Sequence, residues 1–177
     1  MRFWHRLAGV TDGDEETAGR RNPIEYLVIA AWRSGLRLMA NHCIIPSLRV
    51  QLLRWSGLQI GKRTQVNLNC NFIDGFEPGL IILEDEVAVA PGVSFVAESH
   101  PNNSILHRQY HLGKKGPIRI KRGAWLGVGV VVMPGITIGE ASIVGANAVV
   151  TQDVEDYAIV VGLPAKKIGD VRETKSE

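Results

Sequence analysis

Residues 120–150 read IKRGAWLGVGVVVMPGITIGEASIVGANAVV, and in this stretch a branched apolar residue returns at every sixth position. These anchors are Ile120, Leu126, Val132, Ile138, Val144 and Val150. A period of six fits neither an α-helix, which repeats at 3.6 residues, nor a plain strand, which repeats at two. It is typical of a solenoid in which each hexad supplies one short strand and one corner. We therefore expect the anchors to point inward and to stack on one another.

The repeat begins well before residue 120 and changes phase twice. Earlier anchors with the same spacing of six are Ile60, Val66, Phe72, Leu83, Val89 and Phe95. The first change of phase predicts a bulge near residues 75–79. The second contains residues 101–117, which carry no anchor and which we interpret as a loop extruded from the wall. Long loops in compact folds often carry function.

Small residues follow many anchors, where a bulky side chain would obstruct a corner. Examples are Gly61, Ala90, Gly127, Gly139 and Gly145. Three hexads would close one triangular coil, and successive coils would stack at the spacing of a parallel sheet, about 4.8 Å. The sequence therefore predicts an all-β fold, a parallel β-helix over residues 57–168.

Residues 23–56 predict a helical segment ahead of the repeat. Apolar residues dominate 23–45, Pro46 ends the first helix, and Ser47 is a candidate cap for a second helix that runs to Trp55. The helices either cover the open edge of the coil or lie on a membrane surface, and we favour the first alternative. The most apolar run, residues 24–32, has about half the length that a membrane span needs.

Charge and cysteine content narrow the class of protein further. The formal net charge is +2, which predicts no nucleic acid or other polyanion as partner. Cys43 and Cys70 are the only cysteines, and we interpret them as free, buried thiols in a reducing compartment. We interpret residues 1–22 as a polar tail, without the apolar stretch of a signal peptide, and we expect a second tail over residues 169–177. We expect a cytoplasmic protein, peripheral to the inner face of the membrane if the helices bind lipid.

Three motifs stand out within and beside the repeat: Asn67-Leu68-Asn69-Cys70 with Asp74, Ala90-Pro91-Gly92-Val93 leading to Ser99-His100-Pro101, and Trp125 to Ile168, with Val161-Gly162-Leu163-Pro164-Ala165-Lys166-Lys167 near its end. With these motifs the chain resembles the hexapeptide-repeat acetyltransferases that act on maltose, galactosides, nodulation factors and exopolysaccharides. The resemblance implies a homotrimer that transfers an acetyl group from acetyl-CoA to a sugar or glycan hydroxyl in polysaccharide biosynthesis. It also implies a left-handed coil, although the general rule for parallel crossovers predicts the right hand.

The resemblance assigns roles on the acceptor side of the site to three residues. At the position of His100 the family carries its general base, which takes the proton of the attacking hydroxyl. Asn67 matches an asparagine that contacts the substrate or the oxyanion, and Asp74 matches a substrate-side carboxylate. Asn67, Asn69 and Asn71 alternate with apolar residues, which predicts that all three amides face outward from one strand. Asn69 is therefore a further candidate for contact with the substrate, and Trp125 is another, as a wall of the thioester pocket.

Acetyl-CoA is expected along the later coils. By family position, Val128 and Ala146 would offer backbone groups to the pantetheine arm. Thr151, Pro164, Lys166 and Lys167 would lie toward the adenine and phosphate end, where a phosphate favours a cation. The chemistry needs no metal.

A zinc enzyme of the carbonic anhydrase type is the alternative, since His100, His107 and His111 lie in or beside the predicted loop. In those enzymes the ligands come from different coils and meet between subunits, whereas here the three histidines lie within one loop. A catalytically silent scaffold is a third interpretation. The identity of the acceptor, the choice between O- and N-acylation, and the length of the acyl group stay open.

Overall fold

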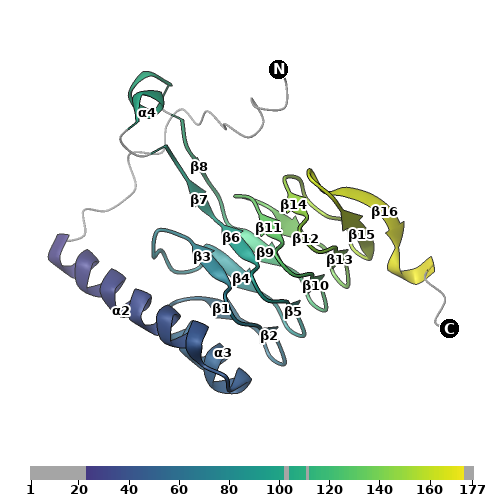
Figure 1. The fold of residues 1–177 in the computed structure, drawn as a ribbon, viewed down its shortest axis with the longest axis horizontal. Helices are drawn as coiled ribbons and strands as arrows, with labels where there is room; N and C mark the ends of the chain where they lie inside the picture. The colour runs from purple at the N-terminus through teal and green to yellow at the C-terminus, as the bar shows by residue number, and fades with distance from the viewer. Residues whose placement is uncertain (1–22, 102–103, 111, 174–177) are drawn as a thin grey trace.

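The computed structural model describes residues 23–101, 104–110 and 112–173. Within them the chain winds into a prism whose three walls are parallel sheets, and each coil adds one strand to each wall (Figure 1). The predicted parallel β-helix is confirmed.

The strands follow the hexads closely, and we name the three sheets wall A, wall B and wall C. Wall A contains β1 (Gln59–Ile60), β4 (Ile81–Leu83), β9 (Ile118–Ile120) and β12 (Thr137–Ile138). Wall B contains β2 (Gln65–Val66), β5 (Ala88–Val89), β10 (Trp125–Leu126), β13 (Ile143–Val144), β15 (Ala158–Val161) and β16 (Lys166–Asp170). Wall C contains β3 (Asn71–Ile73), β6 (Ser94–Val96), β11 (Val131–Val132) and β14 (Val149–Val150). Only β16 runs antiparallel to its neighbour in these walls.

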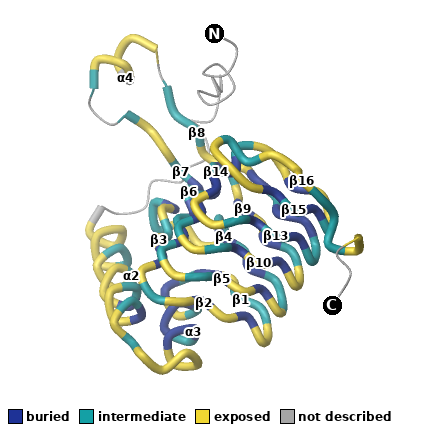
Figure 2. Tube along the Cα trace, turned by 45° about the vertical axis from the view of Figure 1, so that its right-hand side comes forward, coloured by how far each residue is buried: buried dark blue, intermediate teal, exposed yellow. Residues whose placement is uncertain are grey.

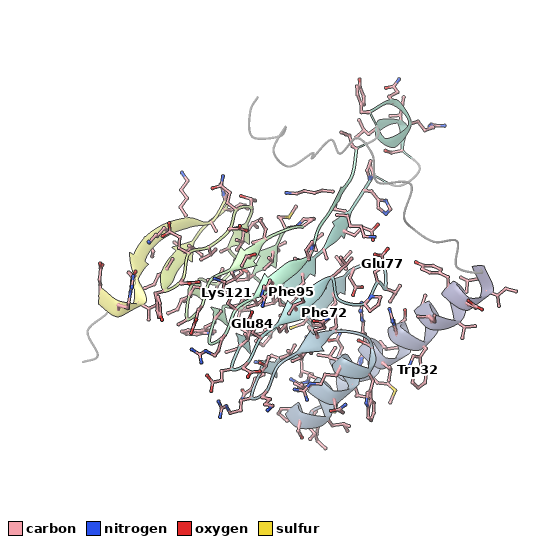
Figure 3. All side chains as sticks on the ribbon, turned by 180° about the vertical axis from the view of Figure 1, so that it is seen from behind. Trp32, Phe72, Glu77, Glu84, Phe95 and Lys121 are labelled. Carbon is pink, nitrogen blue, oxygen red and sulfur yellow. The ribbon has the colours of Figure 1, made fainter. Side chains whose placement is uncertain are left out.

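The anchors fill the prism and lie directly above one another. On wall B, Val89 pairs with both Val66 and Leu126, and Leu126 pairs with Val144. On wall C the rings of Phe72 and Phe95 stack with their centroids 5.4 Å apart (Figure 3). Burial alternates with exposure along every coil (Figure 2). Each fully buried branched side chain stabilises the fold by about 1.5–3 kcal/mol. The anchors therefore make up much of the core, together with buried corner residues such as Val93 and Val130.

The corners use left-handed backbone. Between walls B and C, Asn69, Gly92, Gly129 and Asn147 all have positive φ, between 57° and 75°. Asparagine and glycine are the residues that adopt this conformation most readily. The expectation that Asn67, Asn69 and Asn71 share one strand is therefore wrong. Asn67 follows β2 on wall B, Asn69 turns the corner, and Asn71 begins β3 on wall C.

Two helices, α2 (Pro23–His42) and α3 (Pro46–Trp55), lie across the first coil, at the opposite end from β16 (Figure 1). The predicted cap at Ser47 is wrong, because α3 already begins at Pro46 and no side chain caps it. Neither helix is long and apolar enough to cross a bilayer, and the same holds for the other two helices in the described ranges, α4 (Ile105–Tyr110) and the 3-10 helix η1 (Val171–Glu173).

Arginines attach the helices to the edge of the first coil. Arg37 donates to both carboxylate oxygens of Asp74, at 2.8 and 2.7 Å. Arg49 is buried and donates to the carbonyl oxygen of Val66 at 2.8 Å, and Arg54 donates to that of Gly61 at 2.7 Å. The first coil has no further coil beneath it to pair with its backbone, so the guanidinium groups satisfy carbonyls that would otherwise be left at an edge.

An arm leaves the prism after the second coil. β7 (Glu98–Ser99) and β8 (Lys114–Lys115) pair antiparallel, and α4 lies at the far end of the arm (Figure 1). The sequence indicated only loop over residues 101–117, so the helix and the strand β8 are additional elements. The two cysteines are free, but only Cys70 is buried, so the expectation of two buried thiols is wrong for Cys43. Burial raises the pKa of the Cys70 thiol to about 11.

The ion pair between Arg37 and Asp74 should be a main attachment of the helices. Asp74 is almost fully buried, so Arg37→Met leaves an unpaired carboxylate in the interior. We expect this change to lower the free energy of unfolding by about 3 kcal/mol. Arg122→Met, which breaks an exposed pair with Glu140, is the matched control and should leave stability nearly unchanged. Urea unfolding of the two variants measures the difference, and equal midpoints would contradict this role for Arg37.

Candidate active site

His100 lies at the base of the arm, directly after β7. Its side chain is 47% exposed, so the imidazole can reach a bound molecule. The returning strand of the arm passes close by, because a Cβ on Gly113 would lie 3.5 Å from the Cβ of His100. The Cβ of His100 thus lies beside the returning chain at Gly113, while about half of its side chain stays open to solvent.

A carboxylate accompanies His100. Oε1 of Glu98 lies 3.8 Å from Nε2 of His100, within the range of a direct electrostatic attraction when the ring is protonated. Gly75, in left-handed backbone with φ of 58°, makes room for this carboxylate, because a Cβ there would collide with Oε2 of Glu98. The sequence analysis missed Glu98. The signal was its position two residues before His100, since residues two apart in a strand share one face.

The other charges at the base of the arm form a second pair. Lys115 of β8 lies opposite Glu98 in the register of the arm and makes an ion pair with Glu77. Lys114 lies opposite Ser99. Figure 3 shows Glu77 near the point where the arm leaves the prism. Lys115 makes its ion pair with Glu77 and not with Glu98, although Glu98 lies opposite it. The carboxylate of Glu98 therefore faces the imidazole of His100.

One chain does not bring Asn67 and His100 together. Asn67 lies at the corner between walls B and C, where its Nδ2 donates to the carbonyl oxygen of Val89 at 3.0 Å. His100 follows β6 and β7, beyond the opposite end of wall C. The two residues therefore stand at opposite edges of the same wall.

The structure corrects the prediction for Asp74. This carboxylate is 2% exposed, its two oxygens accept from Arg37, and Oδ1 also accepts from the backbone N–H of Phe76 at 3.1 Å. It holds α2 to the first coil and cannot contact a polyol. Its partner is 37 positions away in the sequence, so no local pattern indicated this role.

Two further substrate candidates lie away from His100. Asn69 is exposed at its corner, and its left-handed backbone explains why an asparagine occupies that position. Trp125 is 54% exposed on the outer face of wall B, between Ala88 and Ile143 of the neighbouring strands. Neither side chain is placed beside the base of the arm in the same chain.

Two of the residues predicted to hold CoA lie along one corner. Val128 and Ala146 are exposed on successive coils between walls B and C, although the Val128 carbonyl already accepts from Asn147 N–H at 2.8 Å. The turn that contains Pro164 bonds to Val149, two residues before Thr151. Val128, Ala146 and this turn therefore lie on successive coils, whereas Thr151 follows β14 at the far end of wall C.

The adjacent lysines on β16 have different partners. Lys167 makes an ion pair with Glu155 at 2.7 Å. Lys166 is exposed, and no carboxylate of the described residues pairs with it. Lys166 is thus the better candidate for a phosphate of CoA, because its charge is not already neutralised.

The zinc alternative depends on side chains outside the described residues. His111 and the side chain of His107 fall in that group. Among the side chains that the structure places, no group of three metal-binding residues converges.

Comparisons with known proteins agree with this geometry. Residues 117–152 match the family described as bacterial transferase hexapeptide (six repeats). A relative from Staphylococcus aureus (strain Mu50), assigned to the acetyltransferases by name only, is 41% identical over 111 residues, 63% of this chain and 54% of the relative. The galactoside O-acetyltransferase of Escherichia coli (strain K12) is 30% identical over 118 residues, 67% of this chain and 56% of the relative. The chain spans about half the length of these relatives.

A solved structure covers almost the whole chain. It is a hexapeptide-repeat containing acetyltransferase from Vibrio cholerae O1 biovar eltor in complex with acetyl coenzyme A. It is 27% identical, with a TM-score of 0.69 over 97% of this chain and 99% of that chain. With the repeat, the three-walled coil and these relatives in agreement, the chain belongs to the hexapeptide-repeat acetyltransferase family.

Proposed function

We propose that the chain is an acetyl-CoA-dependent O-acetyltransferase that acts on a sugar or glycan hydroxyl. The observation that carries the proposal is an open imidazole, His100, with a carboxylate 3.8 Å away at the base of the arm. The neighbour solved with acetyl coenzyme A supports the donor, and the galactoside enzyme at 30% identity supports a sugar as acceptor. The left hand of the coil and a role in polysaccharide biosynthesis belong to the same proposal.

His100 acts as the general base. It takes the proton of the acceptor hydroxyl while the hydroxyl oxygen forms a bond to the thioester carbonyl carbon. The carbon–sulfur bond breaks, and the imidazolium returns its proton to the departing thiolate, so that protons and electrons balance. The hydroxyl attacks directly, and no covalent bond to the protein is needed.

Glu98 is a positioning residue in this scheme. The imidazole becomes a cation while it carries the proton, and the nearby carboxylate stabilises that cation. The space above Gly75 fixes where this carboxylate lies. At the other end of the site, the exposed corner with Val128 and Ala146 would hold the pantetheine arm, and Lys166 would face a phosphate.

We include a homotrimer with shared sites in the proposal. His100 and Asn67 stand at opposite edges of wall C, so both can reach one substrate only if a second chain supplies one of them. Flat walls allow three prisms to pack around a common axis in closed symmetry. Trp125, exposed on wall B, would then approach the site from the neighbouring chain as well.

Replacement of His100 tests the chemistry. His100→Ala should lower turnover by roughly 10²- to 10⁴-fold, because the hydroxyl loses its base. CoA release against a panel of sugars and nucleotide sugars measures turnover, and calorimetry should show unchanged CoA binding. Wild-type turnover in the variant would show that another group removes the proton.

Glu98→Gln separates the positioning role from a structural one. We expect kcat to fall about tenfold, which corresponds to about 1.4 kcal/mol, while KM for acetyl-CoA and the unfolding midpoint stay unchanged. Glu77→Gln is the matched control, because Glu77 pairs with Lys115 and should leave kcat almost unaffected. If the two substitutions lower kcat equally, Glu98 has no specific role in positioning or stabilising the imidazole of His100.

Mixed oligomers test the shared site. His100→Ala and Asn67→Ala are each prepared as nearly inactive protein, unfolded, mixed and refolded together. Some pockets then receive an intact His100 and an intact Asn67 from different chains, so part of the activity should return. A refolded sample of either variant alone is the control. If mixing is verified by mass and activity stays at the level of that control, each chain carries its own complete site.

A further inference from the structure

The side of α2 turned away from the coil is apolar along the whole helix. We call it the outer face of α2, and the turn after the helix continues it. Its large side chains, each more than half exposed, are Ile24, Leu27, Val28, Trp32, Leu38, Met39, Ile44 and Ile45. Ala31 and Gly35 fill the space between them. Figure 2 shows this side of α2 as exposed, and Figure 3 shows Trp32 on it.

The outer face is larger than an ordinary exposed patch. If each of these eight side chains exposes roughly 100 Å², the face measures on the order of 800 Å². The largest apolar patch on a typical soluble monomer is about 300–600 Å². A face of this size needs a partner that is itself apolar.

The polarity of α2 is the reverse of that expected for a surface helix, which normally turns its charged side to water. The arginines of α2 instead lie on the side that faces the first coil, beside the buried Leu36 and Ala40. Arg37 pairs there with Asp74, and Arg33 donates to the carbonyl oxygen of Phe76. The side of the helix that carries its arginines is therefore packed on the coil, and the outer face is left for another surface.

This end of the molecule is also cationic. Between Tyr26 and Ile73 the sequence contains no aspartate or glutamate, but it contains Arg33, Arg37, Arg49, Arg54, Lys62 and Arg63. Only Arg37 and Arg63 make an ion pair with a described residue. The charges of the other four cations are not neutralised by an ion pair with a described residue, so this end of the molecule carries net positive charge near the outer face of α2.

The charge decides between two partners. If a second copy bound across a two-fold axis, the cationic ends of the two chains would face each other, and the repulsion between like charges would disfavour the dimer. A bilayer with anionic lipids offers an apolar interior for the side chains of the outer face, and its negative surface potential attracts the positive charge of this end, including the exposed Lys62.

We propose that the outer face of α2 docks the protein on the surface of a membrane that contains anionic lipids. The helix, about 30 Å long, would lie in the plane of the headgroups without crossing the bilayer. Since α2 and α3 lie across the first coil, the prism would stand on the membrane by that end (Figure 1). The proposal is independent of the acetyl transfer.

Sedimentation with vesicles tests the docking. The full chain is mixed with phosphatidylcholine vesicles, with or without about one-third phosphatidylglycerol. We expect at least tenfold tighter binding to the anionic vesicles, weakened by 0.5 M salt because salt screens the headgroup charge. The double substitution Trp32→Glu and Leu38→Glu should reduce binding at least tenfold. Ile168→Glu is the matched control, since this exposed apolar side chain lies on β16 at the far end of the prism.

Several results would overturn the proposal. Equal binding by the double variant and the control would show that lipid is held elsewhere. Equal binding to neutral and anionic vesicles would show that the positive charge of this end does not contribute to membrane binding. Absence of binding to either vesicle, together with a molar mass that falls in lipid-free buffer when Leu38 becomes Glu, would show that the face joins copies of the chain. If the double variant fails to fold, Leu27→Ser with Met39→Ser replaces it, and the lipid-charge and salt dependence of the unsubstituted chain still decides.

Discussion

Hydrogen bonds between successive coils are the constraint on which the rest of this structure depends. The backbone N–H of Ser94 donates to the carbonyl of Val130 at 2.8 Å, and that of Val131 donates to Ala148 at 2.9 Å. Such bonds form only if every coil repeats the outline of its neighbour. That requirement imposes the period of six, places like anchors in columns, and fixes left-handed backbone at the same corner of each coil.

A stack of coils has two ends, and the ends explain the elements that are not β-helix. At the first coil, α2 and α3 bring arginines to carbonyls that have no neighbouring strand. At the last coil, β16 folds back antiparallel on β15 and covers that edge. The candidate site occupies a third irregularity, where the arm interrupts the stack between β6 and β9. Chemistry is thus placed where the repeat stops, as is common for sites on regular scaffolds.

The regular part of this fold could be predicted from the sequence because each coil repeats the same pattern of residues. The anchors from Ile60 to Val150 can be found by looking for a branched or aromatic apolar residue at every sixth position. The failures concern contacts between distant positions. Asp74 appeared to be a substrate-side carboxylate because its partner, Arg37, belongs to another element. Asn69 appeared to lie on a strand because asparagine fits both a solvated strand and a left-handed corner. The pairing of β7 with β8 depends on residues about fifteen positions apart, whereas Glu98 could have been found from strand alternation alone.

The stack of coils also acts as a ruler. Each coil adds about 4.8 Å to the length of the prism, so position along the axis is counted in whole steps. The arm that carries His100 leaves after the second coil, roughly 10 Å from the end covered by α2, and β16 lies about four steps farther on. The addition or loss of one complete coil would shift these levels by one step and leave the walls in register. The distance of the arm from the end covered by α2 can therefore change by whole coils without a change in how the core is packed.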